Sequence, residues 1–196
     1  MSLTSGYRVE PASWDVDRAD LEAVRRAVFI VEQAIPEDEE WDALDARSRH
    51  VVARDAEDRP IGTARLTPDQ MIGRVAVLRE WRGRGVGEAL MQSLVGRARE
   101  VGYPAIELHA QTHAIPFYAR LGFETQGDEF MECGIPHRLM RLALAPAPVV
   151  ERTAPTLERL EARTIAFTGS EAVLAATLEI IDLARHELCL ITRDLD

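Results

Sequence analysis

The 196-residue chain contains no lysine and no asparagine, so all 23 of its basic residues are arginines. The absence of lysine excludes the GKS or GKT sequence of a P-loop nucleotide site, and the absence of asparagine excludes N-glycosylation. Acidic residues number 33, which gives a net charge of -10. This balance argues against a nucleic-acid binder, whose affinity depends on pairing cations with phosphates, and against an anionic membrane surface.

Cysteine and long apolar runs are equally scarce. Cys133 and Cys189 are far apart and belong to no CxxC or Cys/His cluster, so we expect neither a disulfide scaffold nor a metal site. No apolar run approaches the roughly 20 residues that span a bilayer, and the N-terminus MSLTSGYRVEP lacks the pattern of a signal peptide. We therefore expect a cytoplasmic protein of bacterial type, with a core built from its 46% hydrophobic residues.

Hydrophobic periodicity predicts a mixed α+β fold for most of the chain. Runs of strands interrupted by two crossover helices are typical of a mixed sheet with flanking helices. The expected elements, in order, are a strand over 7–10, a helix over 17–31, a hairpin over 50–54 and 61–66, a strand over 71–78, a helix over 86–100, a strand over 105–109, a short helix over 115–121, and closing strands over 123–132 and 137–144.

The last quarter of the chain follows a different pattern. We predict a main domain over 1–145, a Pro-rich linker over 146–156, and a βαβ-like extension over 157–196 that is either docked or the start of a truncated second domain. The extension has one apolar helix face. We expect that face to be covered by the main domain or by a second copy of the chain, and the reach of the linker favours a homodimer.

A glycine-rich turn, R-G-R-G-V-G over 82–87, joins an expected strand to an expected helix. Exposed amides and the positive end of a helix dipole attract phosphate there, and glycines let it approach closely. The spacing GxGxG differs from the dinucleotide fingerprint GxGxxG. A tight turn with solvated arginines is the alternative, but the strand–turn–helix context favours a phosphate site.

The sequence V-A-V-L-R-E-W-R-G-R-G-V-G-E-A-L resembles the acyl-CoA-binding motif of the GNAT superfamily of N-acetyltransferases, Q/R-x-x-G-x-G/A. Arg82, Gly85 and Gly87 occupy its defining positions. A second segment, Q-T-H-A-I-P-F-Y-A-R-L-G-F, resembles the family pattern N-x-x-A-x-x-F/L-Y-x-x-x-G-F, with Gln111 in place of the commoner asparagine. The segments A-V-F-I-V-E-Q, I-G-R-V and G-I-P-H are similar to the ElaA-type subgroup, so the resemblance covers about residues 7–144.

The resemblance implies a mostly antiparallel sheet whose two central parallel strands, here 71–78 and 105–109, splay apart. It also implies acetyl-CoA as co-substrate and an amine acceptor. The pantetheine arm would lie along Val75 and Val77, with the Val77 amide polarising the thioester oxygen. The implied cofactor-binding residues are Val75, Val77, Arg82, Gly83, Arg84, Gly85, Val86, Gly87, Gln111, Phe117 and Tyr118.

For catalysis, the resemblance implies that Tyr118 donates a proton to the departing thiolate. The base is less determined: we rank Glu132 and His137 first and Glu32 next, with relay through water as an alternative. By strand alternation, Glu107 and His109 share a face. The acidic segment P-E-D-E-E-W-D either attracts a cationic acceptor or is a solvated loop.

These observations favour an acetyl-CoA-dependent N-acetyltransferase in which a primary amine of a small molecule or peptide attacks the thioester directly. The alternative from another class is a non-catalytic acyl-CoA-binding or sensing module attached to a C-terminal domain. A third reading makes the acetyltransferase an accessory to that domain.

Overall fold

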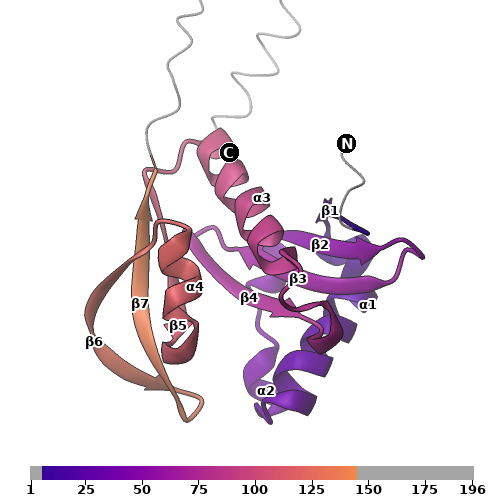
Figure 1. The fold of residues 1–196 in the computed structure, drawn as a ribbon, viewed down its shortest axis with the longest axis horizontal. Helices are drawn as coiled ribbons and strands as arrows, with labels where there is room; N and C mark the ends of the chain where they lie inside the picture. The colour runs from indigo at the N-terminus through magenta and orange to yellow at the C-terminus, as the bar shows by residue number, and fades with distance from the viewer. Residues whose placement is uncertain (1–5, 145–196) are drawn as a thin grey trace, which may run out of the picture. The chain divides into compact units, whose positions relative to one another are not determined.

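The computed structural model describes residues 6–144. The linker expected over 146–156, the extension over 157–196 and its covered face lie outside the described residues. Within them the fold is a seven-stranded, mostly antiparallel sheet with flanking helices, in the order β1-β2-β3-β4-β5-β7-β6 (Figure 1). The expected α+β architecture is thereby confirmed.

All the elements that periodicity predicted between residues 7 and 144 are present. Their bounds are β1 Tyr7–Ala12, α1 Trp14–Arg25, a π-helical segment η1 Arg26–Glu32, α2 Glu37–Glu40, η2 Asp45–Arg47, β2 Arg49–Asp55, β3 Pro60–Leu66, β4 Met71–Val77, η3 Arg79–Trp81, α3 Val86–Val101, β5 Ala105–Gln111, η4 Thr112–Ala114, α4 Ile115–Arg120, β6 Glu124–Glu132 and β7 Ile135–Ala143. The helix expected over 17–31 is the main difference, since it changes to π-helical winding at Arg26.

The seven-stranded sheet is almost divided into two halves between β4 and β5. The parallel strands β4 and β5 pair only at Met71 with Glu107 and at Ile72 with Leu108, after which they part. Figure 1 shows β1 to β4 on one side of the resulting gap and β5, β7 and β6 on the other. Every other neighbouring pair is antiparallel, so this one short parallel junction confirms the expected splay.

A bulge in β4 lies directly beyond the junction. The pairing of β3 with β4 shifts between Thr63 and Arg65, and Arg74 has a positive φ of 53°. One extra residue reverses which face a strand's side chains occupy. As a result Ile72 before the bulge and Val75 and Val77 after it all pack on the same core cluster.

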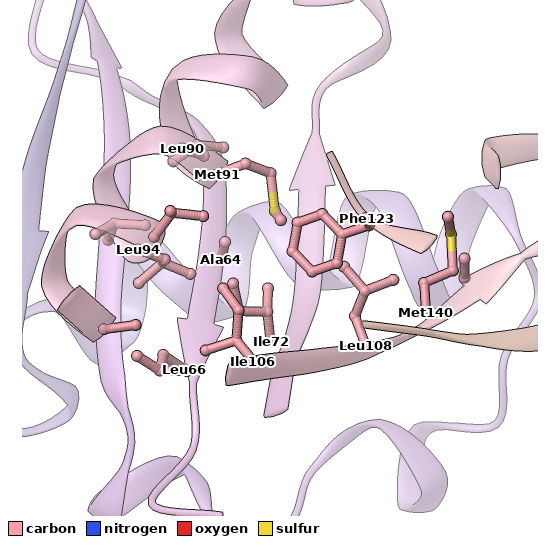
Figure 2. Close-up of a cluster of buried hydrophobic side chains, with 14 of the residues drawn as sticks. Ala64, Leu66, Ile72, Leu90, Met91, Leu94, Ile106, Leu108, Phe123 and Met140 are labelled. Carbon is pink, nitrogen blue, oxygen red and sulfur yellow. The ribbon is translucent and has the colours of Figure 1, made fainter. Parts of the chain in front are cut away.

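Helix α3 connects the two halves of the sheet through this cluster. Val86, Leu90, Leu94 and Ala98 form its buried face, as their spacing predicted. In Figure 2, Leu90, Met91 and Leu94 lie over side chains from both halves, namely Ala64, Leu66, Ile72, Ile106, Leu108, Phe123 and Met140. Each fully buried side chain of this kind stabilises the fold by roughly 1.5–3 kcal/mol relative to exposure.

The opposite face of β4 carries a separate, smaller cluster. Val24 of α1 and Val28 of η1 pack there against Ala76, with Phe29 and Leu78 at its edge. The gap between β4 and β5 is therefore bordered by α3 and α4 on one face and by η1 on the other. Among residues 6–144, no helix is long and apolar enough to cross a membrane.

Candidate active site

A cleft of about 1200 Å³ occupies the gap between β4 and β5. Its walls come from η1, β4, the glycine turn, β5, α4 and the turn between β6 and β7. The four side chains predicted to be catalytic all line it: Tyr118, Glu132, His137 and Glu32. Of the predicted cofactor residues, those that line it are Val75, Val77, Arg82, Gly83, Gly85, Val86, Gly87, Gln111, Phe117 and Tyr118. Arg84 does not line it, and its guanidinium carbon lies 5.0 Å from the centroid of the Trp81 ring.

The glycine turn presents backbone rather than side chains to the cleft. Gly83 and Gly85 have positive φ values of 71° and 83°, which glycine adopts without strain. Gly85 caps the start of α3, and no side chain of the described residues bonds the amides of that first turn. A Cβ at Gly85 would lie 3.2 Å from the Tyr7 hydroxyl, and one at Gly87 would lie 3.5 Å from the Phe117 ring. The turn therefore suits an anion at a helix N-terminus.

The free edge of β4 continues the wall from this turn. The Leu78 amide donates to the Ile61 carbonyl of β3 at 2.9 Å. Because peptide groups alternate in direction along a strand, the amides of Val77 and Val75 point away from β3, toward the gap. The Val77 carbonyl accepts a bond from Arg82 Nε at 2.9 Å, which agrees with this direction.

Arg82 is clamped by Glu32 at the end of η1. The two side chains form paired hydrogen bonds of 2.7 and 2.8 Å. The bond from Arg82 holds the pKa of the Glu32 carboxyl below its usual range. Glu32 is thus ionised and paired at neutral pH, which favours holding Arg82 over removing a proton. Next to it, Gln111 Nε2 donates to Gln33 Oε1 at 3.0 Å across the gap.

Tyr118 lies on the α4 side of the cleft among aromatic rings. Its ring contacts Phe117 edge-on, with centroids 4.9 Å apart, and Phe123, with centroids 6.2 Å apart. Burial raises the pKa of the Tyr118 hydroxyl to about 12. The group therefore keeps its proton at neutral pH.

Glu132 and His137 lie on the wall formed by β6 and β7, and each has its own partner. Glu132 Oε2 is 3.0 Å from Nδ1 of His109. Nδ1 of His137 donates to the Ile135 carbonyl at 2.8 Å, and that ring is buried. Glu107 lies on the same face of β5 as His109 but outside the cleft. Its Oε1 is 3.9 Å from Nε of Arg141.

A buried arginine cluster supports the floor of the cleft, and sequence reasoning missed it. Arg25, with no exposed surface, bonds Glu40 at 2.6 Å and Asp45 at 2.7 Å. Arg65 bonds the same Asp45 and also Asp42, each at 2.6 Å. The rings of Trp41 and Trp14 lie 4.8 and 5.5 Å from the Arg25 guanidinium carbon.

Arg74 joins this cluster from the β4 bulge, bonding Glu40 at 3.1 Å. Glu40 and Asp42 belong to the segment P-E-D-E-E-W-D, and Glu37 of that segment pairs with Arg26. Much of the acidic charge expected to attract a cationic acceptor is therefore neutralised within the protein. In residues 6–144 no group of three or more His, Cys, Asp or Glu side chains is arranged to hold a metal ion.

Comparison with known families agrees with this geometry. The model of the acetyltransferase (GNAT) domain matches residues 17–144, well over half of the chain. The chain belongs to the GNAT acetyltransferase family. Members of this family are enzymes, and the family implies acyl-CoA-dependent acetyl transfer.

Individual GNAT relatives resemble the chain over the same region. The uncharacterized N-acetyltransferase YjcF of Bacillus subtilis (strain 168) is 39% identical over 121 residues, which are 60% of this chain and 86% of YjcF. The structure of Escherichia coli ElaA superposes with a TM-score of 0.61 at 28% identity, covering 69% of this chain and 98% of ElaA. An acyl-CoA N-acyltransferase from Pseudomonas aeruginosa gives a TM-score of 0.63 at 28% identity, with 70% and 99% covered. The expected ElaA-type resemblance is thereby confirmed.

Proposed function

We propose that this GNAT enzyme transfers the acetyl group of acetyl-CoA to a primary amine of a small molecule or peptide by direct attack. The observation that carries the proposal is the cleft itself. It joins a phosphate-binding turn, a free strand edge and a protonated tyrosine on one face of the gap to a carboxylate and two histidines near the other.

The residues present fit an acyl-CoA. The turn over 82–87 offers amides to a pyrophosphate at the helix N-terminus, and a Cβ at Gly85 would crowd the Tyr7 hydroxyl at 3.2 Å. The free amides of Val75 and Val77 suit the amide groups of a pantetheine arm, while Gln111 and Phe117 border its path. Arg82 lies at the pyrophosphate end of the cleft, where Glu32 fixes its side chain.

Acetyl-CoA supplies an activated thioester whose sulfur leaves when an amine attacks the carbonyl carbon. The Val77 amide, fixed by the strand, is the donor for the thioester oxygen, as in an oxyanion hole. Tyr118 gives its proton to the departing sulfur. On the opposite wall lie Glu132 and His137, the first-ranked residues from the sequence for taking the amine's proton, and Glu32 acts through Arg82.

The test is to incubate the full chain with acetyl-CoA and a panel of primary amines and to follow release of free CoA thiol. Amine-dependent release, with the acetylated amine detected by mass spectrometry, is the expected result. Binding of acetyl-CoA by calorimetry without release for any amine would instead support the non-catalytic acyl-CoA-binding module.

Replacing Gly85 by valine is expected to weaken acetyl-CoA binding at least tenfold while the fold is retained. A β-branched side chain at a φ of 83° is strained, and its Cβ would lie 3.2 Å from the Tyr7 hydroxyl, so the turn has to shift and its amides leave the positions that suit a pyrophosphate. Calorimetric titration measures the affinity. Gly96→Ala in the middle of α3, where an added Cβ meets nothing within 4 Å, is the matched control. Equal affinity of the Gly85 variant and the wild type would contradict the assignment of the turn.

A further inference from the structure

His109 lies in the cleft and is held in place from two directions. Its Nδ1 is 3.0 Å from Glu132 Oε2, and its ring contacts Phe130 edge-on with centroids 4.8 Å apart. Both partners belong to β6. A carboxylate accepting the Nδ1 proton leaves the lone pair on Nε2, which is the tautomer of a general base.

The face of β5 that carries His109 is opposite the face that carries the proposed proton donor. Ile106, Leu108 and Ala110 point into the main core, against which Tyr118 also packs. By strand alternation His109 points the other way, and its side chain is 41% exposed. Because the cleft passes through the gap from one face to the other, a thioester between these side chains would meet the amine on the His109 side.

We propose that Nε2 of His109 is the general base that takes the proton from the acceptor amine, and that Glu132 is the positioning residue for the imidazole. This inference rests on the proposed acetyl transfer. His137 is less suited because it is 8% exposed, and because the carbonyl that accepts from its Nδ1 is neutral and cannot stabilise an imidazolium as the Glu132 carboxylate does.

The proton balance then closes. His109 removes one proton from the acceptor ammonium and releases it to solvent. The nitrogen lone pair forms the C–N bond, the C–S bond breaks, and the sulfur receives the Tyr118 proton. The second proton lost by the nitrogen returns through solvent to Tyr118, so the products are an acetylated amine, free CoA thiol and one proton.

His109→Gln is expected to lower kcat/KM at pH 7 about 100-fold or more, the usual range for loss of a general base. The acetyl-CoA affinity should stay within about threefold of wild type, because His109 lies on the acceptor face. In the pH profile, kcat/KM of the variant should keep rising with pH as the free amine forms, while the wild type levels off earlier. The other charged or titratable groups that share this face of β5 and β7 or line the cleft beside it are Glu39, Arg74, Cys133, His137, Glu107 and Arg141.

A double-variant cycle separates positioning from direct catalysis. Glu132→Ala should cost roughly tenfold alone and nothing further when added to His109→Gln, because its effect passes through the imidazole. Glu107→Gln, on the same face of β5 but outside the cleft, is the control and should retain wild-type rates.

Two results would overturn the assignment. One is a His109→Gln enzyme within threefold of wild type across the pH range. The other is a Glu132→Ala loss that equals or exceeds the His109→Gln loss and adds to it, which would make Glu132 the base. Both results require a wild-type enzyme that turns over. They are therefore distinct from failure of the proposed function, in which the wild type releases no CoA thiol with any of the amines tested.

Discussion

Replacing Asp45 by asparagine is expected to lower the free energy of unfolding by about 3–5 kcal/mol at pH 7. Asp45 is 1% exposed and accepts hydrogen bonds from Arg25 at 2.7 and 3.1 Å and from Arg65 at 2.6 Å. The asparagine cannot balance two buried guanidinium charges, which then stay in the core without full compensation. Urea denaturation followed by circular dichroism measures the loss.

The pH dependence of this difference has a definite sign. Burial alone would raise the pKa of Asp45, but hydrogen bonds from Arg25 and Arg65 outweigh it and hold that pKa below its ordinary value. Stability from such a group is complete above the ordinary pKa of aspartic acid, near 4, and is lost as the pH falls through the lowered folded-state pKa. The difference in free energy of unfolding between wild type and variant should therefore be largest near neutral pH and should decrease below about pH 4.

Asp38→Asn is the matched control. Asp38 lies on the same acidic segment but is exposed, so its replacement should change stability by no more than about 0.5 kcal/mol. A loss below about 1 kcal/mol for the Asp45 variant would mean that the arginines find other partners, and the cluster would then not be the support of the cleft floor.

Tyr118→Phe is expected to lower kcat about 100- to 10,000-fold, the range that a positioned proton donor contributes. The ring that packs between Phe117 and Phe123 is kept, so the KM for acetyl-CoA should change less than threefold. Since burial raises the pKa of this hydroxyl to about 12, its ionisation does not account for any decline in rate at lower pH. Steady-state kinetics at saturating substrates measure the effect.

Tyr103→Phe is the control for losing a tyrosine hydroxyl. Tyr103 also packs partly buried against the main core, but it does not line the cleft, so its variant should keep the wild-type kcat. If Tyr118→Phe stays within threefold of wild-type kcat, Tyr118 serves as packing alone, or thiolate protonation does not limit turnover.

The elements themselves were predictable because local signals and burial agree in this chain. The helix over 86–101 follows from apolar residues at helical spacing between Gly85 and Gly102, and Gly102 adopts the left-handed conformation that ends such helices. The glycine turn over 82–87 could also be predicted from local sequence. Its glycines lie between a strand and a helix, in an order that few other kinds of site share.

Other features depend on contacts between distant segments and left little local trace. The bulge at Arg74 reverses the faces of β4, yet nothing in M-I-G-R-V-A-V marks it beyond an arginine inside an apolar run. Arg25 and Arg65 could have indicated the buried cluster in the same way. Each interrupts an apolar pattern, and each is buried in an ion pair with Asp45. Alternation along β5 predicted the face on which His109 lies. Its contact with Glu132 depends on the path of β6, which the sequence does not reveal.

The short β4–β5 junction also has a mechanical consequence. Strands β4 and β5 pair at only two positions. The two half-sheets are therefore joined by backbone hydrogen bonds near one end of the gap and elsewhere are held together by their packing on α3. A molecule that binds along both half-sheets stabilises the folded state by an amount set by the ratio of its free concentration to its Kd. Amide hydrogen exchange at the tips of β4 and β5 would then slow when that molecule binds, while exchange in β1 and β2 would change little.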